Sequence, residues 1–173
     1  MTNSLLARTG GSTNLDAVAA AREFYAAVKQ PDMHFVLFYC SPDYDLERLG
    51  AELARLFEGV RVVGCTTAGE IGPLGYLTGS IAGVSIASPR FTVTTRCIEG
   101  LAQLSFGRGV ELGGELKSDL RQRGLPADPE RCFALLLIDG LAMREEIMVS
   151  AVYRGLGDIQ LFGGSAGDNT RFQ

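Results

Sequence analysis

Two stretches of the chain, residues 35–70 and 133–168, repeat one pattern, and this repeat limits the possible folds more than any other feature. Each stretch has 36 residues and contains an apolar run, a turn, an amphipathic helix, a short apolar strand and a glycine-rich loop. Uninterrupted apolar runs are typical of strands buried on both faces of a parallel sheet. A helix between two such strands favours a right-handed βαβ crossover. We therefore predict two βαβ units related by an internal duplication.

The loops give the closest match between the two stretches. Thr67-Ala68-Gly69-Glu70 aligns with Ser165-Ala166-Gly167-Asp168, and a one-residue gap also aligns Gly64 with Gly163. Two βαβ units can look alike through their architecture alone. The shared order of hydroxyl residue, alanine, glycine and carboxylate favours duplication over that alternative.

The remaining segments add a helix before the first unit, and a hairpin and a helix between the two units. Residues 14–30 and 110–123 carry apolar residues at spacings of three and four, which predicts two amphipathic helices. Residues 80–86 and 91–97 flank a Ser-Pro-Arg turn, and the second run alternates with threonine, which predicts an antiparallel hairpin at a sheet edge. The predicted fold is one α/β domain over residues 1–173. It has a mixed sheet with both βαβ units at its centre, the hairpin toward one side and helices packed on the sheet.

Composition restricts the chemistry. The chain has 16 Lys and Arg against 20 Asp and Glu, so it lacks the basic excess of a protein that tracks nucleic-acid phosphates. A single histidine, His34, excludes a zinc site with several His ligands and a histidine acid–base pair. The chain has neither an apolar run of about 20 residues nor a secretory signal pattern. We therefore expect a cytoplasmic location.

The four cysteines, Cys40, Cys65, Cys97 and Cys132, have no CxxC spacing. Each lies within or at the end of an apolar, strand-like run. We expect buried, reduced thiols rather than disulfides, because free cysteine behaves as a small apolar residue.

Three segments resemble the signature of the FIST domain, a bacterial sensory domain. They are Val62-Val-Gly-Cys-Thr-Thr-Ala-Gly-Glu-Ile71, Leu136-Leu-Ile-Asp-Gly-Leu141 and Gly163-Gly-Ser-Ala-Gly-Asp168. The resemblance spans residues 15–168. It implies small-ligand sensing in signal transduction, with amino acids as proposed ligands and with histidine kinases or cyclic-dinucleotide enzymes as partners. Some members are associated with haem and nitric oxide.

Full-length members of that family carry a second, C-terminal FIST region. This chain stops at Gln173, so the resemblance implies the N-terminal part only. A domain that lacks covering elements exposes a sheet edge or an apolar patch, which favours self-association. We expect a homodimer or larger assembly, with the C-terminal region or residues 80–98 in the contact.

The glycine-rich loops are the candidate binding site, because α/β sheets bind ligands at the carboxyl ends of their strands. Glycine permits close backbone approach, and free N–H groups can hold a carboxylate or phosphate. Threonine and serine add hydroxyls, and the two carboxylates could hold an ammonium group. No Gly-Lys-Ser/Thr follows, so neither loop is a P-loop. The predicted ligand-binding residues are Gly64, Cys65, Thr66, Thr67, Gly69, Glu70, Gly163, Gly164, Ser165, Gly167 and Asp168. The alternative is that these residues only build tight turns.

Catalysis is the second hypothesis. Cys65 is a candidate nucleophile, but it needs a base, and parallel pairing of the first βαβ unit would put His34 at the opposite end of the strands. Thr66 or Thr67 would need a nearby lysine, histidine or amine, and none is evident. We therefore expect a non-catalytic sensory domain that binds an amino-acid-like ligand. An interaction scaffold without a small ligand is a third reading.

No cofactor is expected. Haem ligation by His34 is the alternative that the resemblance suggests, but the chain has no CxxCH motif and no second histidine. An exposed histidine at the start of a strand is the simpler interpretation. Asp139, Glu145 and Glu146 read as partners of a helix dipole rather than metal ligands.

Overall fold

The computed structural model of the chain describes residues 6–72 and 75–168. The chain divides into two compact units. The N-terminal unit extends to Thr92 and also includes Gly167 and Asp168, and the C-terminal unit comprises Val93–Ala166. None of the helices in the described ranges has the length and hydropathy to cross a membrane.

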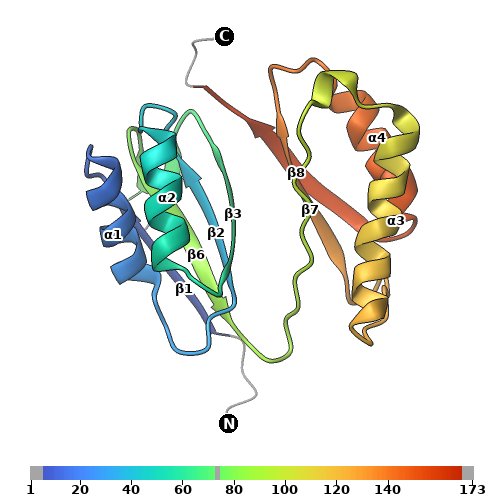
Figure 1. Cartoon of the computed structure of the whole chain (residues 1–173), viewed down its shortest axis with the longest axis horizontal. Coiled ribbons are helices and arrows are strands. Elements are labelled where there is room, and N and C mark those ends of the chain that lie inside the picture. Colours follow the sequence, from blue (N-terminus) through green and yellow to red (C-terminus); the bar gives the residue numbers. More distant parts are fainter. Residues whose placement is uncertain (1–5, 73–74, 169–173) are drawn as a thin grey trace. The chain divides into compact units, whose positions relative to one another are not determined.

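The N-terminal unit is built on a four-stranded mixed sheet with the strand order β1-β6-β2-β3 (Figure 1). β2 (Phe35–Cys40) runs parallel to β3 (Arg61–Thr66) and antiparallel to β6 (Ile81–Ala87), which also pairs with β1 (Leu6–Ser12). The α/β class and the mixed sheet are therefore confirmed.

Two helices supply the core of this unit. They are α1 (Ala17–Val28) and α2 (Leu46–Leu56), capped by the Asp16 and Asp45 carboxylates. Phe24 of α1 is fully buried, and its ring centroid lies 6.0 Å from that of Phe57, the residue that ends α2. Both rings join one apolar cluster with alternate residues of β2. The apolar stripes of the helices thus bury one face of the sheet.

The predicted hairpin of residues 80–86 and 91–97 is wrong. Residues 91–97 form no strand, and β6 pairs with β1 and β2 instead. Because both edges of β6 are occupied, no edge is left for the predicted partner. β1 was not predicted, because Gly10 and Gly11 give this strand a weak strand propensity. A smaller antiparallel hairpin joins β4 (Glu70–Gly72) to β5 (Gly75–Leu77).

The C-terminal unit contains the second βαβ unit. β7 (Phe133–Asp139) and β8 (Gln160–Ala166) are parallel, with α4 (Glu145–Leu156) between them in sequence. A short 3-10 helix, Leu101–Gln103, precedes α3 (Phe106–Gln122), which packs against α4 through glycines. A Cβ atom on Gly113 would lie 2.6 Å from the Gly155 carbonyl carbon, so only glycine permits this approach.

The two βαβ units belong to separate sheets, which corrects the expectation that both lie at the centre of one sheet. The expected burial of residues 133–138 on both faces is also wrong, because 60% of Phe133 and 42% of Leu135 are exposed. An apolar run predicts a strand but does not specify what covers it. The registers nevertheless agree: Gly64 lies opposite Phe38 on β2, and Gly163 lies opposite Leu136 at the same place on β7.

Candidate functional site

The first predicted loop follows β3, at the edge where β2 also ends and β6 begins. Thr67 donates its backbone N–H to the Cys40 carbonyl at 2.9 Å, which continues the parallel pairing by one residue. Ser41 donates to the Ser80 carbonyl at 2.8 Å, beside the start of β6. The loop of residues 67–69 is therefore fixed to the ends of three neighbouring strands.

Glu70 anchors this loop from inside. Its side chain is 1% exposed. One carboxylate oxygen accepts a hydrogen bond from the Thr67 hydroxyl at 2.8 Å. The other accepts from the Ser80 hydroxyl at 2.5 Å and from the Ser80 backbone N–H at 3.3 Å. These donors occupy both oxygens, so in this conformation Glu70 holds the loop and does not face solvent.

Ala68 and Gly69 give the loop its free donors. Among the described residues, the backbone N–H groups of Ala68 and Gly69 make no hydrogen bond. Ala68 is exposed, and Gly69 is half-buried. Two successive free N–H groups are the arrangement that binds carboxylate or phosphate oxygens. Ala68 was absent from the predicted site, although it stands inside the repeated loop motif.

Gly64, Cys65 and Thr66 lie in β3 itself rather than in a loop. A Cβ atom on Gly64 would lie 2.6 Å from the Phe38 carbonyl oxygen, so this glycine permits close approach of the two strands. All three residues are half-buried. Gly64 has a demonstrable structural role, and ligand contact by these residues remains a prediction.

The residues of the second predicted loop are divided between the two units. Gly163, Gly164 and Ser165 are exposed residues of β8 in the C-terminal unit. A Cβ atom on Gly164 would meet no heavy atom within 4 Å. Gly167 belongs to the N-terminal unit, where its N–H donates to the Thr66 carbonyl at 3.0 Å. The structure thus brings Gly167 to the first loop.

Cys65 and His34 lie at opposite ends of the parallel strand pair. Cys65 is opposite Tyr39, and His34 precedes Phe35, the first residue of β2. This separation along β2 is five residues, about 16 Å at a rise of about 3.3 Å per residue. Burial raises the pKa of the Cys65 thiol, which favours the unreactive protonated form.

His34 is half-buried, not exposed as the simpler interpretation expected. Its Nε2 atom forms a hydrogen bond with the Phe91 carbonyl at 2.8 Å. Its imidazole therefore ties the segment after β6 to the start of β2. This contact could not be predicted from the sequence, because the partner is a backbone group 57 residues away.

All four cysteines are free. Cys40 is buried, and burial together with the nearby Glu70 raises the pKa of its thiol to about 12. Cys65 and Cys132 are half-buried, and Cys97 is exposed. The expectation of four buried thiols is therefore wrong for Cys97, because residues 91–97 form no buried strand.

Carboxylates at the second predicted strand end make local contacts. Asp139 accepts the Leu141 N–H at 2.9 Å, and Glu145 and Glu146 stand in the first turn of α4. Over residues 6–72 and 75–168, no group of three or more His, Cys, Asp or Glu side chains is arranged to hold a metal ion. Within this part of the chain, the loop of residues 67–69 with Glu70 is the arrangement that best suits a small ligand.

Comparison with models of protein families gives a match that covers most of the chain. The family model of the FIST N domain matches residues 34–173, which include β2, β3, both loops and the whole second βαβ unit. Residues 15–33, which the sequence resemblance also covered, lie outside this match. No curated protein matches the chain significantly. Because the match covers most of the chain, this protein belongs to the FIST N domain family, a family of sensory domains in signal transduction.

Proposed function

We propose that this chain is a non-catalytic sensory input domain that binds a small, amino-acid-like ligand. The observation that carries the proposal is the loop of residues 67–69. Its free N–H groups on Ala68 and Gly69 are held in place by the buried Glu70 carboxylate. A preformed pair of donors binds a carboxylate without first paying the cost of ordering a loop.

The proposed site comprises residues 64–70 with Gly167 and Asp168, all in the N-terminal unit. Gly163, Gly164 and Ser165 are proposed as a corresponding binding element in the C-terminal unit. Their support is the register, which places Gly64 and Gly163 at equivalent positions of the two strand pairs.

The chemistry of Cys65 favours binding over catalysis. A nucleophilic cysteine needs a lowered pKa or an adjacent base, whereas burial raises the pKa of this thiol and His34 lies at the far end of the strands. A covalent adduct on Cys65, Thr66 or Thr67 after incubation with an acyl probe would favour the enzyme alternative.

A thermal-shift screen with the twenty L-amino acids tests the proposal, with native mass spectrometry to detect a copurified ligand. We expect Gly69→Val and Gly164→Val to fold and to lose the ligand-induced increase in melting temperature. The three atoms nearest to a Cβ on Gly69 all belong to the movable Tyr76 side chain, and a Cβ on Gly164 would meet no atom within 4 Å. Gly50→Val is the control matched to Gly164→Val, because a Cβ on Gly50 of α2 would also meet no atom within 4 Å. If no amino acid raises the melting temperature of the wild-type chain, the proposal fails.

We further propose a cytoplasmic domain without a resident cofactor, acting with a histidine kinase or a cyclic-dinucleotide enzyme. The haem alternative predicts a Soret band in the purified protein that is lost in His34→Gln.

Self-association is also proposed. Its support is the exposed aromatic pair Phe133 and Phe162, whose ring centroids are 6.1 Å apart on a two-stranded sheet. Light scattering over a concentration series tests it, and a monomer at high micromolar concentration would contradict it.

A further inference from the structure

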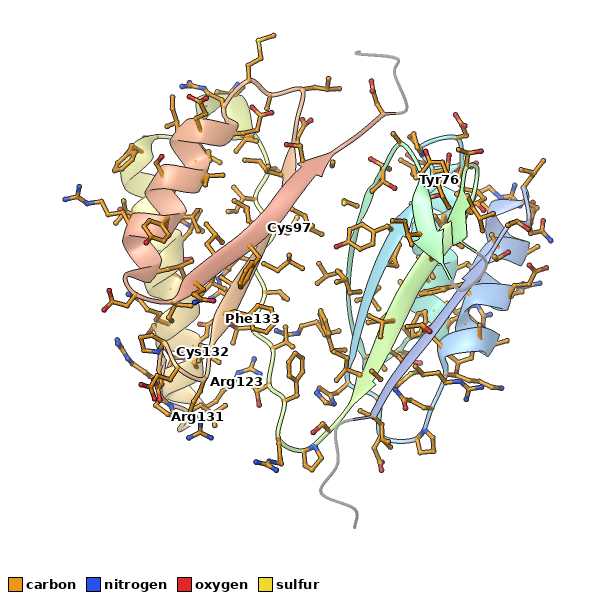
Figure 2. The ribbon with its side chains drawn as sticks, turned by 180° about the vertical axis from the view of Figure 1, so that it is seen from behind. Tyr76, Cys97, Arg123, Arg131, Cys132 and Phe133 are labelled. Carbon is orange, nitrogen blue, oxygen red and sulfur yellow. The ribbon has the colours of Figure 1, made fainter. Side chains whose placement is uncertain are left out.

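Tyr76 covers the backbone of the candidate loop. It lies on β5, and a Cβ atom on Gly69 would be 2.6 Å from its Cε2 atom and closer still to Cζ and Oη. Its hydroxyl also donates a long hydrogen bond of 3.4 Å to the Ala68 carbonyl. The side chain nevertheless remains 67% exposed. Part of the Tyr76 side chain therefore packs on the loop, while most of it is exposed. Tyr76 is labelled in Figure 2.

The chain segment that carries Tyr76 has no positively charged side chain. Residues 64–80 contain no lysine, arginine or histidine, and Glu70 is their one charged residue. Glu70 lies buried behind the loop, with both oxygens occupied by Thr67 and Ser80. The carboxylate contributes negative potential there, but a ligand cannot reach it directly in this conformation.

An amino acid that places its carboxylate on the Ala68 and Gly69 N–H groups needs a partner other than Glu70 for its ammonium. The other carboxylate of the proposed site, Asp168, already has an interaction of its own. The Tyr76 ring packs on Gly69, one of these two residues. Aromatic faces attract cations within about 6 Å of the ring centre. We propose that Tyr76, rather than Glu70, receives the ammonium group of the ligand. This inference rests on the proposed function and names the residue that distinguishes an amine from an uncharged analogue.

The test compares Tyr76→Phe and Tyr76→Leu, using the twenty L-amino acids and their N-acetyl derivatives as probes. Phe keeps the ring, whereas Leu keeps apolar bulk without the ring. For the amino acid that binds the wild-type chain best, we expect Tyr76→Leu to bind about two- to five-fold more weakly, as for a cation–π contact at an exposed site. Tyr76→Phe should bind like the wild type, and the N-acetyl derivative should bind Tyr76→Leu and wild type equally.

Tyr153→Leu is the matched control, because Tyr153 is an exposed tyrosine on α4 in the other unit. A titration of wild-type protein containing ring-labelled tyrosine gives a second readout, with the Tyr76 resonance among the five tyrosines assigned from its absence in Tyr76→Phe. We expect the Tyr76 ring resonance to shift with the free amino acid. An unshifted resonance, or equal amino-acid binding by Tyr76→Leu and wild type, would overturn the inference while leaving the proposed function intact. Failure of every amino acid to bind the wild type would instead refute the proposed function.

Discussion

β2 and β7 open the two βαβ units, yet their surroundings differ. β2 has β3 on one side and β6 on the other, whereas β7 pairs with β8 in a sheet of two strands. Val36 of β2 is fully buried, and Phe133 of β7 is 60% exposed. Equally apolar strands can therefore have different burial, because burial depends on the elements around a βαβ unit and not on the unit alone.

Positions that match in the strand registers of the two units differ from positions that match in their loop motifs. In the strand registers Thr66 lies opposite Cys40, and Ser165 lies opposite Ile138, the same place on β7. The loop motif instead aligns Ser165 with Thr67, one residue later. A shift of one residue turns a side chain to the other face of a sheet. Matching letters in the two loops therefore do not occupy matching positions.

The largest expected effect tests the difference in burial. Phe24→Ala should lower the free energy of unfolding by about 3–5 kcal/mol, because Phe24 is fully buried against Phe57. At a protein concentration low enough to keep the chain monomeric, Phe133→Ala should cost under about 1 kcal/mol, because most of its side chain is exposed. Urea unfolding followed by circular dichroism measures both. Equal losses would mean that the exposed face of β7 is covered in solution.

The equivalent glycines provide the next test. Gly64→Ala and Gly163→Ala should each cost about 1–3 kcal/mol, because each new methyl group would press on the carbonyl of the neighbouring strand. Gly164→Ala is the matched control in open space, with an expected change within about 0.5 kcal/mol. Thermal unfolding measures the stability of the three variants. If Gly163→Ala were as stable as wild type, the proposed equivalence of Gly64 and Gly163 would be wrong.

The two motif carboxylates should differ in their contribution to stability. Glu70→Gln should cost about 1–3 kcal/mol, because a buried acceptor of the Ser80 and Thr67 donors is lost. Asp168→Asn should cost less, because Asp168 is half-exposed. Glu99→Gln, at an exposed position, is the control. Melting temperatures measured without ligand test this order, and a larger loss from Asp168→Asn would reverse the comparison.

The smallest expected effect on stability concerns the ion pairs on the helices. Hydrogen bonds from Arg55 of the same helix and from Arg22 of α1, the latter at 2.7 Å, lower the pKa of Glu52 in α2 to about 2. A lowered pKa gives stability that is present above the unfolded value of 4.5 and lost as the pH falls toward 2. The melting temperature of Glu52→Gln should therefore lie slightly below wild type at pH 6 and converge with it near pH 2.

In the C-terminal unit, Arg108 and Arg96 lower the pKa of Glu115. Arg108 and Glu115 both belong to α3, whereas the Arg22–Glu52 pair joins two helices. High salt should weaken both sets of contacts, because the arginine side chains in each are substantially exposed to solvent. If the melting temperature of Glu52→Gln still lay below that of wild type at pH 2, the stabilisation could not be assigned to the ionised Glu52 carboxylate.

Sequence periodicity predicted local structure well and long-range pairing poorly. The helix expected at residues 14–30 is α1, and the apolar runs 35–40 and 133–138 are β2 and β7. β1 and its pairing with β6 were missed, because a strand ending in Gly10-Gly11-Ser12 has little strand signal and its partner is distant.

The candidate site shows the same limit. Glycine and hydroxyl residues in the sequence predicted a candidate site at residues 67–69. These residue types suit ligand contact and tight turns alike, so they do not decide between the two. Which side chain faces inward depends on Ser80, ten residues beyond Glu70. Tyr76 carries no local pattern that distinguishes it from any exposed tyrosine. Its place over Gly69 arises from the β4–β5 hairpin.

The pairing of β1 with β6 has a consequence for folding while the chain is being synthesised. Leu6 lies opposite Ala87, so at about 5–20 residues per second β1 waits roughly 4–16 s on the ribosome for its partner strand. During this interval α1 and the β2–α2–β3 segment emerge with their apolar surfaces, while β1 has nothing to pair with. Completion of the N-terminal unit during synthesis is thus timed by β6. Arrest of translation before residue 81 should leave a nascent chain that is captured by chaperones and cleaved by protease.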